Sequence, residues 1–287
     1  MDHGTGTARQ TLLMTSGLDA AVDVARGLGF GAAEPVVIQE TNNTVVWLAP
    51  DPVIAKVATR AESATDLIRE HQVATALDRL GAPVGAPVEG FSPIQHQSTG
   101  FVLTLWQRLP HDPDAEASAR DVGRSLSKVH EALSRCGVPL PSFQAGIERA
   151  RRVLADDRQI STLSQDDRTF LRGAFDALMD RLAGHSFEQR ALHGEPHDAN
   201  YLLTDAGLRW IDFESACWGP VEWDLAFVSS EAREAFPGVD RDLLELLRTL
   251  NSARVATWCW SRYQFPEMRW HAHHHLNVVQ MWWRSPR

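Results

Sequence analysis

A short segment near residue 200 concentrates residues that suit phosphoryl transfer. Asn200 and Asp212 flank two short apolar runs that are joined by a tight turn at 204–207, and Glu195 lies five residues before Asn200. A hairpin of this kind brings Asn200 and Asp212 side by side, where their oxygens could hold Mg²⁺ against phosphates. A nearby carboxylate such as Glu195 could orient or deprotonate an attacking hydroxyl. The segment therefore predicts metal-dependent transfer of a phosphoryl group.

A lysine in the first third of the chain supports the same chemistry. Lys56 is one of two lysines in a chain with 28 Lys+Arg, and it lies within the β-rich run 53–58. Glu70 falls on the apolar face of a helix predicted over 61–80, where a carboxylate needs a cation. We expect Glu70 to pair with Lys56 and hold its ammonium group in place. The alternative is that Glu70 lies at the edge of the apolar face and reaches solvent.

The motifs around this segment resemble a known family. H-G-E-P-H-x-x-N at 193–200 is followed by I-D-F-E at 211–214 and by W-D-L-A at 223–226. This order is similar to the aminoglycoside phosphotransferase family, which includes choline-kinase-like and homoserine-kinase-like enzymes. The resemblance is dense over 190–228. It implies a bilobal, protein-kinase-like fold, ATP or GTP with Mg²⁺ as cofactors, and a small-molecule hydroxyl as the phosphate acceptor.

The resemblance also assigns roles to individual residues. Catalytic roles are implied for Glu195, Asn200 and Asp212, of which Asn200 and Asp212 would also be the metal ligands. The nucleotide would be bound by Lys56, Glu70, Gln107, Asn200 and Asp212, with the base near the connection 106–109. A turn at 41–44 would cover the phosphates. His193, His197 and Asp224 would brace the catalytic loop.

One position departs from the family pattern, because Glu195 stands where aspartate is usual. The extra methylene moves a carboxylate by about 1.5 Å, and misplacement of about 1 Å can cost on the order of a hundredfold in rate. Three interpretations stay open. Glu195 is the base in a site shaped for it, Asp198 contributes, or the protein is a nucleotide-binding pseudokinase with a regulatory or scaffolding role.

Charge gives a hint about the acceptor. The formal net charge is −9, which favours a cationic small molecule or a metal-bridged anion and argues against a nucleic-acid partner. An aminoglycoside-like antibiotic or an amino alcohol would fit, with Glu214, Glu222 and Glu267 as candidate acceptor-binding residues. Four histidines at 271–275 include a pair with the spacing of a helical zinc site, but a polar helix face is the favoured interpretation.

The elements that must position these residues form an α+β chain. Strands are expected over 36–38, 44–48, 53–58, 88–90 and 100–106, and helices over 61–80, 115–135, 144–154, 166–182 and 241–279, the last broken near Pro266. We therefore predict a β-rich nucleotide-binding lobe over 1–109 and a helical catalytic and substrate lobe over 110–287.

Cysteine content and hydropathy set the expected compartment. The three cysteines are far apart and form no C-x-x-C pair, so neither disulfides nor a thiolate metal site is predicted. No signal-peptide pattern and no membrane-spanning run is evident. We expect a cytoplasmic monomer without a membrane partner.

Overall fold

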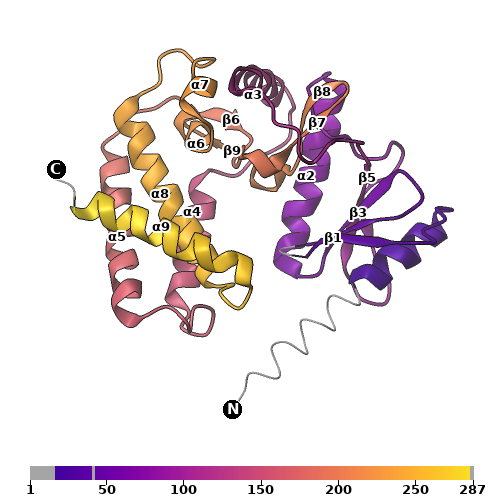
Figure 1. Cartoon of the computed structure of the whole chain (residues 1–287), viewed down its shortest axis with the longest axis horizontal. Helices are drawn as coiled ribbons and strands as arrows, with labels where there is room; N and C mark the ends of the chain where they lie inside the picture. Colours follow the sequence, from indigo (N-terminus) through magenta and orange to yellow (C-terminus); the bar gives the residue numbers. More distant parts are fainter. Residues whose placement is uncertain (1–16, 41–42, 285–287) are drawn as a thin grey trace. The chain divides into compact units, whose positions relative to one another are not determined.

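The computed structural model describes residues 17–40 and 43–284 (Figure 1). Contacts divide the chain into two compact units. The first unit comprises the described residues up to Pro139 together with His197–Ser215, and the second comprises Leu140–Pro196 together with the described residues from Ala216 onward. The boundary predicted between residues 109 and 110 separates a nucleotide-binding lobe from a catalytic lobe. These contact units do not test it, and it stays a prediction.

The first unit is built on an antiparallel sheet with the order β1-β2-β3-β5-β4. Its strands are β1 Val36–Glu40, β2 Thr44–Trp47, β3 Val53–Ala58, β4 Ile94–Gln95 and β5 Val102–Gln107. Strand β3 lies between β2 and β5, and Val53, Ala55 and Val57 are buried on one face. This alternation is the reason that the run forms a strand, and it directs Lys56 to the opposite face.

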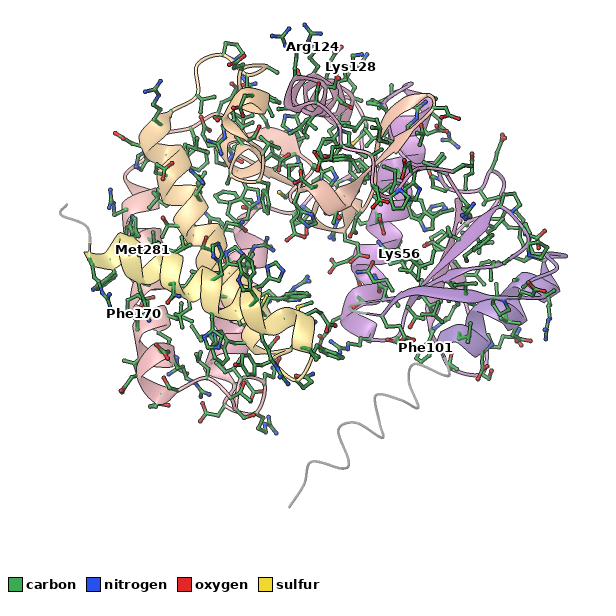
Figure 2. The ribbon with its side chains drawn as sticks, viewed as in Figure 1. Lys56, Phe101, Arg124, Lys128, Phe170 and Met281 are labelled. Atoms are coloured by element: carbon green, nitrogen blue, oxygen red, sulfur yellow. The ribbon has the colours of Figure 1, made fainter. Side chains whose placement is uncertain are left out.

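Two labelled helices belong to this unit: α2 Ala61–Arg79 and α3 Ala119–Leu133. Helix α2 buries Leu67, Ala74 and Leu77 completely, as its apolar face predicted. Ser118 caps α3 by accepting a hydrogen bond from the amide of Asp121. Figure 2 labels both lysines of the chain: Lys56 lies near α2, whereas Lys128 lies on the outer side of α3.

The predicted strand at 88–90 is wrong. Glu89 and Gly90 form a turn, in which Gly90 has φ +84°, a backbone conformation that suits glycine. The backbone amide of Val88 still donates to the carbonyl of Leu105, but no ladder follows. The sheet instead gains its edge strand from β4, which pairs with β5.

A hairpin from the later part of the chain also belongs to the first unit. Strands β7 Tyr201–Thr204 and β8 Gly207–Trp210 pair antiparallel, and Gly207 closes the turn with φ +93°. The short 3₁₀ helices η1 Asp198–Asn200 and η2 Phe213–Ser215 flank the hairpin. Trp210 is fully buried and donates its indole N–H to Ser125 of α3 at 3.1 Å. The hairpin is therefore anchored to the unit.

The second unit is mainly helical. Its elements are α4 Gln144–Ala155, α5 Gln165–Ala183, β6 Arg190–Leu192, β9 Cys217–Gly219, α6 Val221–Leu225, α7 Ser230–Arg233, α8 Arg241–Trp260 and α9 Pro266–Arg284. Helix α8 packs against α9, α4 and α5, and the core contains Phe175, Leu178 and Leu247. Figure 1 shows α8 and α9 running beside each other. Across the described ranges, no helix combines the length and apolar composition needed to cross a membrane.

Candidate active site

Lys56 is the centre of the densest charged cluster in the first unit. Its Nζ lies 2.8 Å from Glu70 Oε2, 3.0 Å from Asp212 Oδ1 and 2.7 Å from Glu214 Oε1. The side chain of Glu70 is buried and that of Lys56 is 14% exposed, whereas that of Asp212 is 42% exposed. The structure therefore brings together three residues predicted from sequence, and it adds Glu214 to them.

The pKa values of this cluster reflect burial and the excess of carboxylates. Burial opposes the charge of Lys56, but Asp212, Glu70 and Glu214 outweigh it and raise the pKa of the ammonium well above its ordinary value. Burial raises the pKa of Glu70 to about 8, against the attraction of Lys56. Burial also raises the pKa of Glu214. Full ionisation of three carboxylates beside one ammonium would leave a negative excess. The raised pKa values of Glu70 and Glu214 reflect the cost of that excess, which a further cation would relieve.

Glu214 was predicted as an acceptor-binding residue, but its contacts lie within this cluster. Asn43, which precedes β2, donates its Nδ2 to Glu214 Oε1 at 2.5 Å. Arg69 of α2 donates to the backbone carbonyl of Glu214 at 2.6 Å and to the Asp66 carboxylate at 2.7 Å. These contacts fix η2 against α2 and against the start of β2. Residues 41 and 42 of the predicted phosphate-covering turn lie outside the described part of the chain.

The β7–β8 hairpin places Asn200 and Asp212 at its open end. The amide of Ile211 donates to the backbone carbonyl of Asn200 at 2.9 Å, which extends the pairing beyond the ladder. Asn200 is buried, and its side-chain amide lies 3.3 Å from His197 Nε2. Asp212 has φ +66°, a left-handed conformation that is uncommon for a residue other than glycine. Such strain is typical of functional sites and directs the Asp212 side chain to Lys56.

The cluster suits a divalent cation. Oxygen atoms of Glu70, Asp212 and Glu214 lie within 4.8 Å of one another, and they form the one such group found among the described residues. Asn43 Oδ1, beside Glu214, is buried and has no hydrogen-bond partner among the described residues. Hard cations such as Mg²⁺ prefer oxygen ligands of this kind. The donor set therefore fits a divalent metal at Asp212. Asn200, the other ligand predicted from sequence, is not part of this group, and metal binding by Asn200 and Asp212 stays a prediction.

Glu195 belongs to the second unit, in the loop after β6. Asp224 of α6 is fully buried and accepts the amides of His193 and Gly194, each at 2.8 Å. Trp223 donates its indole N–H to the carbonyl of Gly194 at 3.1 Å. The loop before Glu195 is thus fixed by α6, and Asp224 makes the backbone contacts expected of it.

Sequence reasoning missed Arg254, which contacts Glu195 directly. Arg254 lies on α8, where its Nη2 donates to Glu195 Oε1. The sequence does not show which helical arginine pairs with Glu195, because 26 of the 28 lysines and arginines are arginines. Arginines in general are mostly exposed. Only the packing of α8 in the second unit reveals the pair.

The remaining predicted residues are described by their own local contacts or exposure. Gln107 ends β5, and its backbone amide donates to the carbonyl of Ala86 at 3.0 Å. Glu222 is buried and accepts the amide of Asp240 at 3.0 Å, just before α8. Glu267 is exposed in the first turn of α9, and Asp198 is exposed at the start of η1. Nucleotide binding by Gln107 and acceptor binding by Glu222 and Glu267 stay predictions.

The histidine-rich segment forms part of helix α9. His271, His273 and His274 are exposed, and His275 is half-buried. In the ranges that the structure describes, these histidines belong to no group of three side chains with metal-ligand spacing. A polar helix face remains the better interpretation of this segment.

Comparison with known proteins identifies the family. Residues 35–265 match the family described as the phosphotransferase enzyme family. The chain belongs to the phosphotransferase enzyme family. Its membership confirms the family that the motifs at 193–226 indicated and makes the chain a small-molecule kinase. A search of curated protein sequences found no match.

Solved structures of low sequence identity share the fold of this phosphotransferase. A choline/ethanolamine kinase family protein from Mesorhizobium loti is 16% identical, with a TM-score of 0.66 and 96% coverage of both chains. The GDP and kanamycin complex of APH(2")-IIia is 14% identical, with a TM-score of 0.66. The match covers 91% of this chain and 96% of that chain. Amicoumacin kinase hAmiN with AMP-PNP and Ca²⁺ is 13% identical, with a TM-score of 0.67. The match covers 90% of this chain and 92% of that chain. These likenesses confirm the predicted protein-kinase-like α+β fold.

Proposed function

We propose that this phosphotransferase moves the γ-phosphoryl group of ATP or GTP to a hydroxyl of a small, amine-bearing molecule, with Mg²⁺ as the metal. The observation that carries the proposal is the cluster in which Lys56 meets Glu70 and Asp212 at 2.8 and 3.0 Å. A lysine fixed by a helix glutamate and next to a metal-binding aspartate is the arrangement that kinases use to hold nucleotide phosphates.

Lys56 would bind the phosphates, and Glu70 would hold the ammonium in place. The three carboxylates already exceed the charge of Lys56, so nucleotide phosphates would enter an acidic site. A divalent cation held by Asp212, with Asn200 and Glu214 as further oxygen donors, would offset that charge. When bound, it would also stabilise the negative charge that develops on the transferred group.

Glu195 would accept a hydrogen bond from the acceptor hydroxyl and then its proton. A bond forms between the hydroxyl oxygen and the γ-phosphorus as the bond to the β-phosphate oxygen breaks, and the nucleoside diphosphate leaves. Asp224 and Trp223 support this role because they fix the backbone on the N-terminal side of Glu195. The most useful contribution of such a loop is to keep the carboxylate within hydrogen-bond reach of the reacting hydroxyl.

The nucleotide and the acceptor are proposed by analogy with the structural relatives. One of these relatives is a complex with GDP and kanamycin, and another is a complex with AMP-PNP and Ca²⁺. Kanamycin, choline and ethanolamine all combine a hydroxyl with a cationic nitrogen. The net charge of −9 is compatible with an acceptor of this class, such as an aminoglycoside-like antibiotic or an amino alcohol.

A screen of acceptors tests the proposal. Purified protein with ATP or GTP and Mg²⁺ is incubated with aminoglycosides and small amino alcohols, and release of nucleoside diphosphate and the mass of the acceptor are measured. We expect one acceptor class to gain a single phosphoryl group. Binding of nucleotide and Mg²⁺ without transfer to any acceptor would instead support the pseudokinase alternative.

A further inference from the structure

The carboxylate of a glutamate at position 195 needs more contacts to hold it in one position than the carboxylate of the aspartate in the family pattern. Glutamate has one additional rotatable bond, so its carboxylate samples more positions for a given backbone position. The Glu195 side chain is 30% exposed, and the α6 contacts at His193 and Gly194 act on the backbone before it. A contact at the carboxylate itself is therefore required if glutamate is to act as a positioned base.

Arg254 supplies a contact at that carboxylate. Its Nη2 donates to Glu195 Oε1, and the arginine side chain is 16% exposed. A guanidinium donates along fixed directions in one plane, so it orients a carboxylate better than an ammonium group would. A carboxylate held at one oxygen can still accept a hydrogen bond at the other.

The position of Arg254 is itself fixed by neighbours in the second unit. Its Nε and Nη2 donate to Asn251 Oδ1, one turn earlier on α8, at 3.1 and 2.9 Å. Its guanidinium carbon lies 5.6 Å from the centre of the Trp223 ring, within cation–π range. Trp223 also binds the carbonyl of Gly194 at 3.1 Å. One aromatic side chain thus contacts both the arginine and the residue before Glu195.

Helix α4 further limits the space around the arginine. A Cβ atom at Gly146 would lie 3.8 Å from Arg254 Cδ, so the α4 backbone passes close to the arginine stem. Asn251 is buried, which restricts its amide to few orientations. The arginine stem thus lies beside α4, while the guanidinium is held from α6 and within α8 and orders the Glu195 carboxylate.

We propose that Arg254 is a positioning residue that fixes the Glu195 carboxylate and so makes glutamate effective where the family pattern has aspartate. This inference rests on the proposed function, because it gives Glu195 the role of proton acceptor. It predicts that Arg254 is needed when residue 195 is glutamate and much less when it is aspartate, whose shorter side chain has one bond fewer to order.

A double-mutant cycle tests the inference in the full chain, with the acceptor that the wild-type protein phosphorylates. Arg254→Ala, Glu195→Asp and the double variant are compared by kcat and by the nucleotide KM. We expect Arg254→Ala to lower kcat about 10- to 100-fold when Glu195 is present. In the Glu195→Asp background we expect Arg254→Ala to change kcat by less than about threefold, because the shorter carboxylate is no longer coupled to the arginine. The nucleotide KM should not change, because Lys56 is untouched.

Two controls separate positioning from folding. Arg248→Ala removes an arginine of the same helix whose partner is the exposed Glu245, and it should leave kcat unchanged. Arg254→Gln keeps a polar side chain on α8 and replaces Arg254→Ala in the cycle if the alanine variant unfolds early in a thermal scan.

The outcomes distinguish the inference from the proposed function. The positioning role would be overturned if Arg254→Ala lowered kcat equally in the wild-type and Glu195→Asp backgrounds, or if it caused no loss when Glu195 is present. In either case, transfer by the wild-type chain would still support the proposed function. A wild-type chain that phosphorylates no acceptor would overturn the proposed function, and the positioning role with it.

Discussion

At the scale of single residues, the proposed chemistry depends on a paired cation, Lys56, and on a supported carboxylate, Glu195. Lys56 contacts three carboxylates, whereas Glu195 contacts the guanidinium of Arg254. The first cluster suits phosphate and metal binding because it combines a fixed ammonium with several oxygen donors. The second suits proton transfer because a carboxylate held by packed neighbours stays in one orientation.

Replacing Glu195 with glutamine tests its role as proton acceptor. The amide keeps the shape of the side chain but cannot accept the proton, so we expect kcat to fall by roughly 10²–10⁴-fold. The nucleotide KM should stay within about twofold, because Lys56, Glu70 and Asp212 keep their contacts. Steady-state release of nucleoside diphosphate in the presence of acceptor measures both constants. Unchanged kcat would show that another group takes the proton, and Asp198→Asn would then be the next variant to measure.

Part of the site was predictable at this scale. Glu70 could be paired with Lys56 because a carboxylate on an apolar helix face requires a cation, and the two side chains do meet at 2.8 Å. Arg254 could not be predicted, since nothing in a helical sequence tells which arginine faces a loop far away in the chain. Glu214 was expected to bind the acceptor, and its ion pair with Lys56 follows from the η2 turn, which the sequence did not predict.

At the scale of elements, the loop that carries Glu195 depends on α6. Asp224 is completely buried and accepts two backbone amides at 2.8 Å. Because such amides cannot find water in the interior, their acceptor is essential to the local structure. The loop is thus positioned by a five-residue helix and not by its own sequence.

Asp224→Ala should therefore destabilise the protein as well as impair transfer. Loss of the acceptor leaves two buried amides unpaired, and we expect the free energy of unfolding to fall by about 2–4 kcal/mol. Urea unfolding followed by circular dichroism measures the change. The matched control is Asp205→Asn in the exposed β7–β8 turn, which should change stability by less than about 0.5 kcal/mol. A similar small effect for both variants would contradict the anchoring role.

The packing of α9 on α8 should depend on pH through His275. Burial lowers the pKa of His275 to about 4, with added repulsion from His274, His271 and Arg254. The ring lies against α8, where Nδ1 is 3.4 Å from Ser252 Oγ. An unfolded histidine has a pKa of about 6.5, so the unfolded chain binds the proton more readily between about pH 6.5 and 4. The contribution of His275 to the free energy of unfolding is thus present above about pH 6.5 and lost as the pH falls towards 4.

His275→Gln should flatten this dependence. Between about pH 7 and 5 we expect the wild-type chain to lose about 1 kcal/mol more of its free energy of unfolding than the variant, a value reduced because the ring keeps some contact with water. Urea unfolding at several pH values across this range measures the difference. His273→Gln on the exposed face is the control, and equal slopes for the wild type and His275→Gln would contradict the prediction.

Elements were predictable where their apolar pattern is strong. Strands β2 and β3 and helix α2 lie within a residue or two of the expected bounds, since buried valines and leucines mark one face of each. Residues 17–27 are helical, and this helix was not predicted. Its buried face relies on small residues, Ala21 and Ala25, whose spacing gives a weak hydrophobic signal.

At the scale of the whole molecule, the two contact units cut across the sequence. The segment His197–Ser215 belongs with the first unit, although it follows the start of the helical part of the chain. Sequence could predict a β-rich part and a helical part from their periodicities. It could not assign the β7–β8 hairpin to the first unit, because that depends on long-range packing such as the burial of Trp210.

Nucleotide should stabilise the molecule strongly only with a divalent metal. A ligand that binds the folded state raises the midpoint of thermal unfolding, and the acidic cluster around Lys56 opposes a nucleotide without its metal. We expect a clearly larger thermal shift with ATP and Mg²⁺ than with ATP and a chelator. Asp212→Asn should reduce the difference between the two conditions. Equal shifts with and without Mg²⁺ in the wild-type chain would show that the cluster does not hold the metal.

The proposed activity of the chain is transfer of a phosphoryl group to a small-molecule hydroxyl. Mass spectrometry of the acceptor, run beside an assay of nucleoside diphosphate, tests it most directly in the wild-type chain and in Asp212→Ala. We predict equal amounts of diphosphate and of singly phosphorylated acceptor from the wild type, and neither from the variant. Diphosphate formed at the same rate without acceptor, an acceptor of unchanged mass, or full turnover by Asp212→Ala would contradict the account.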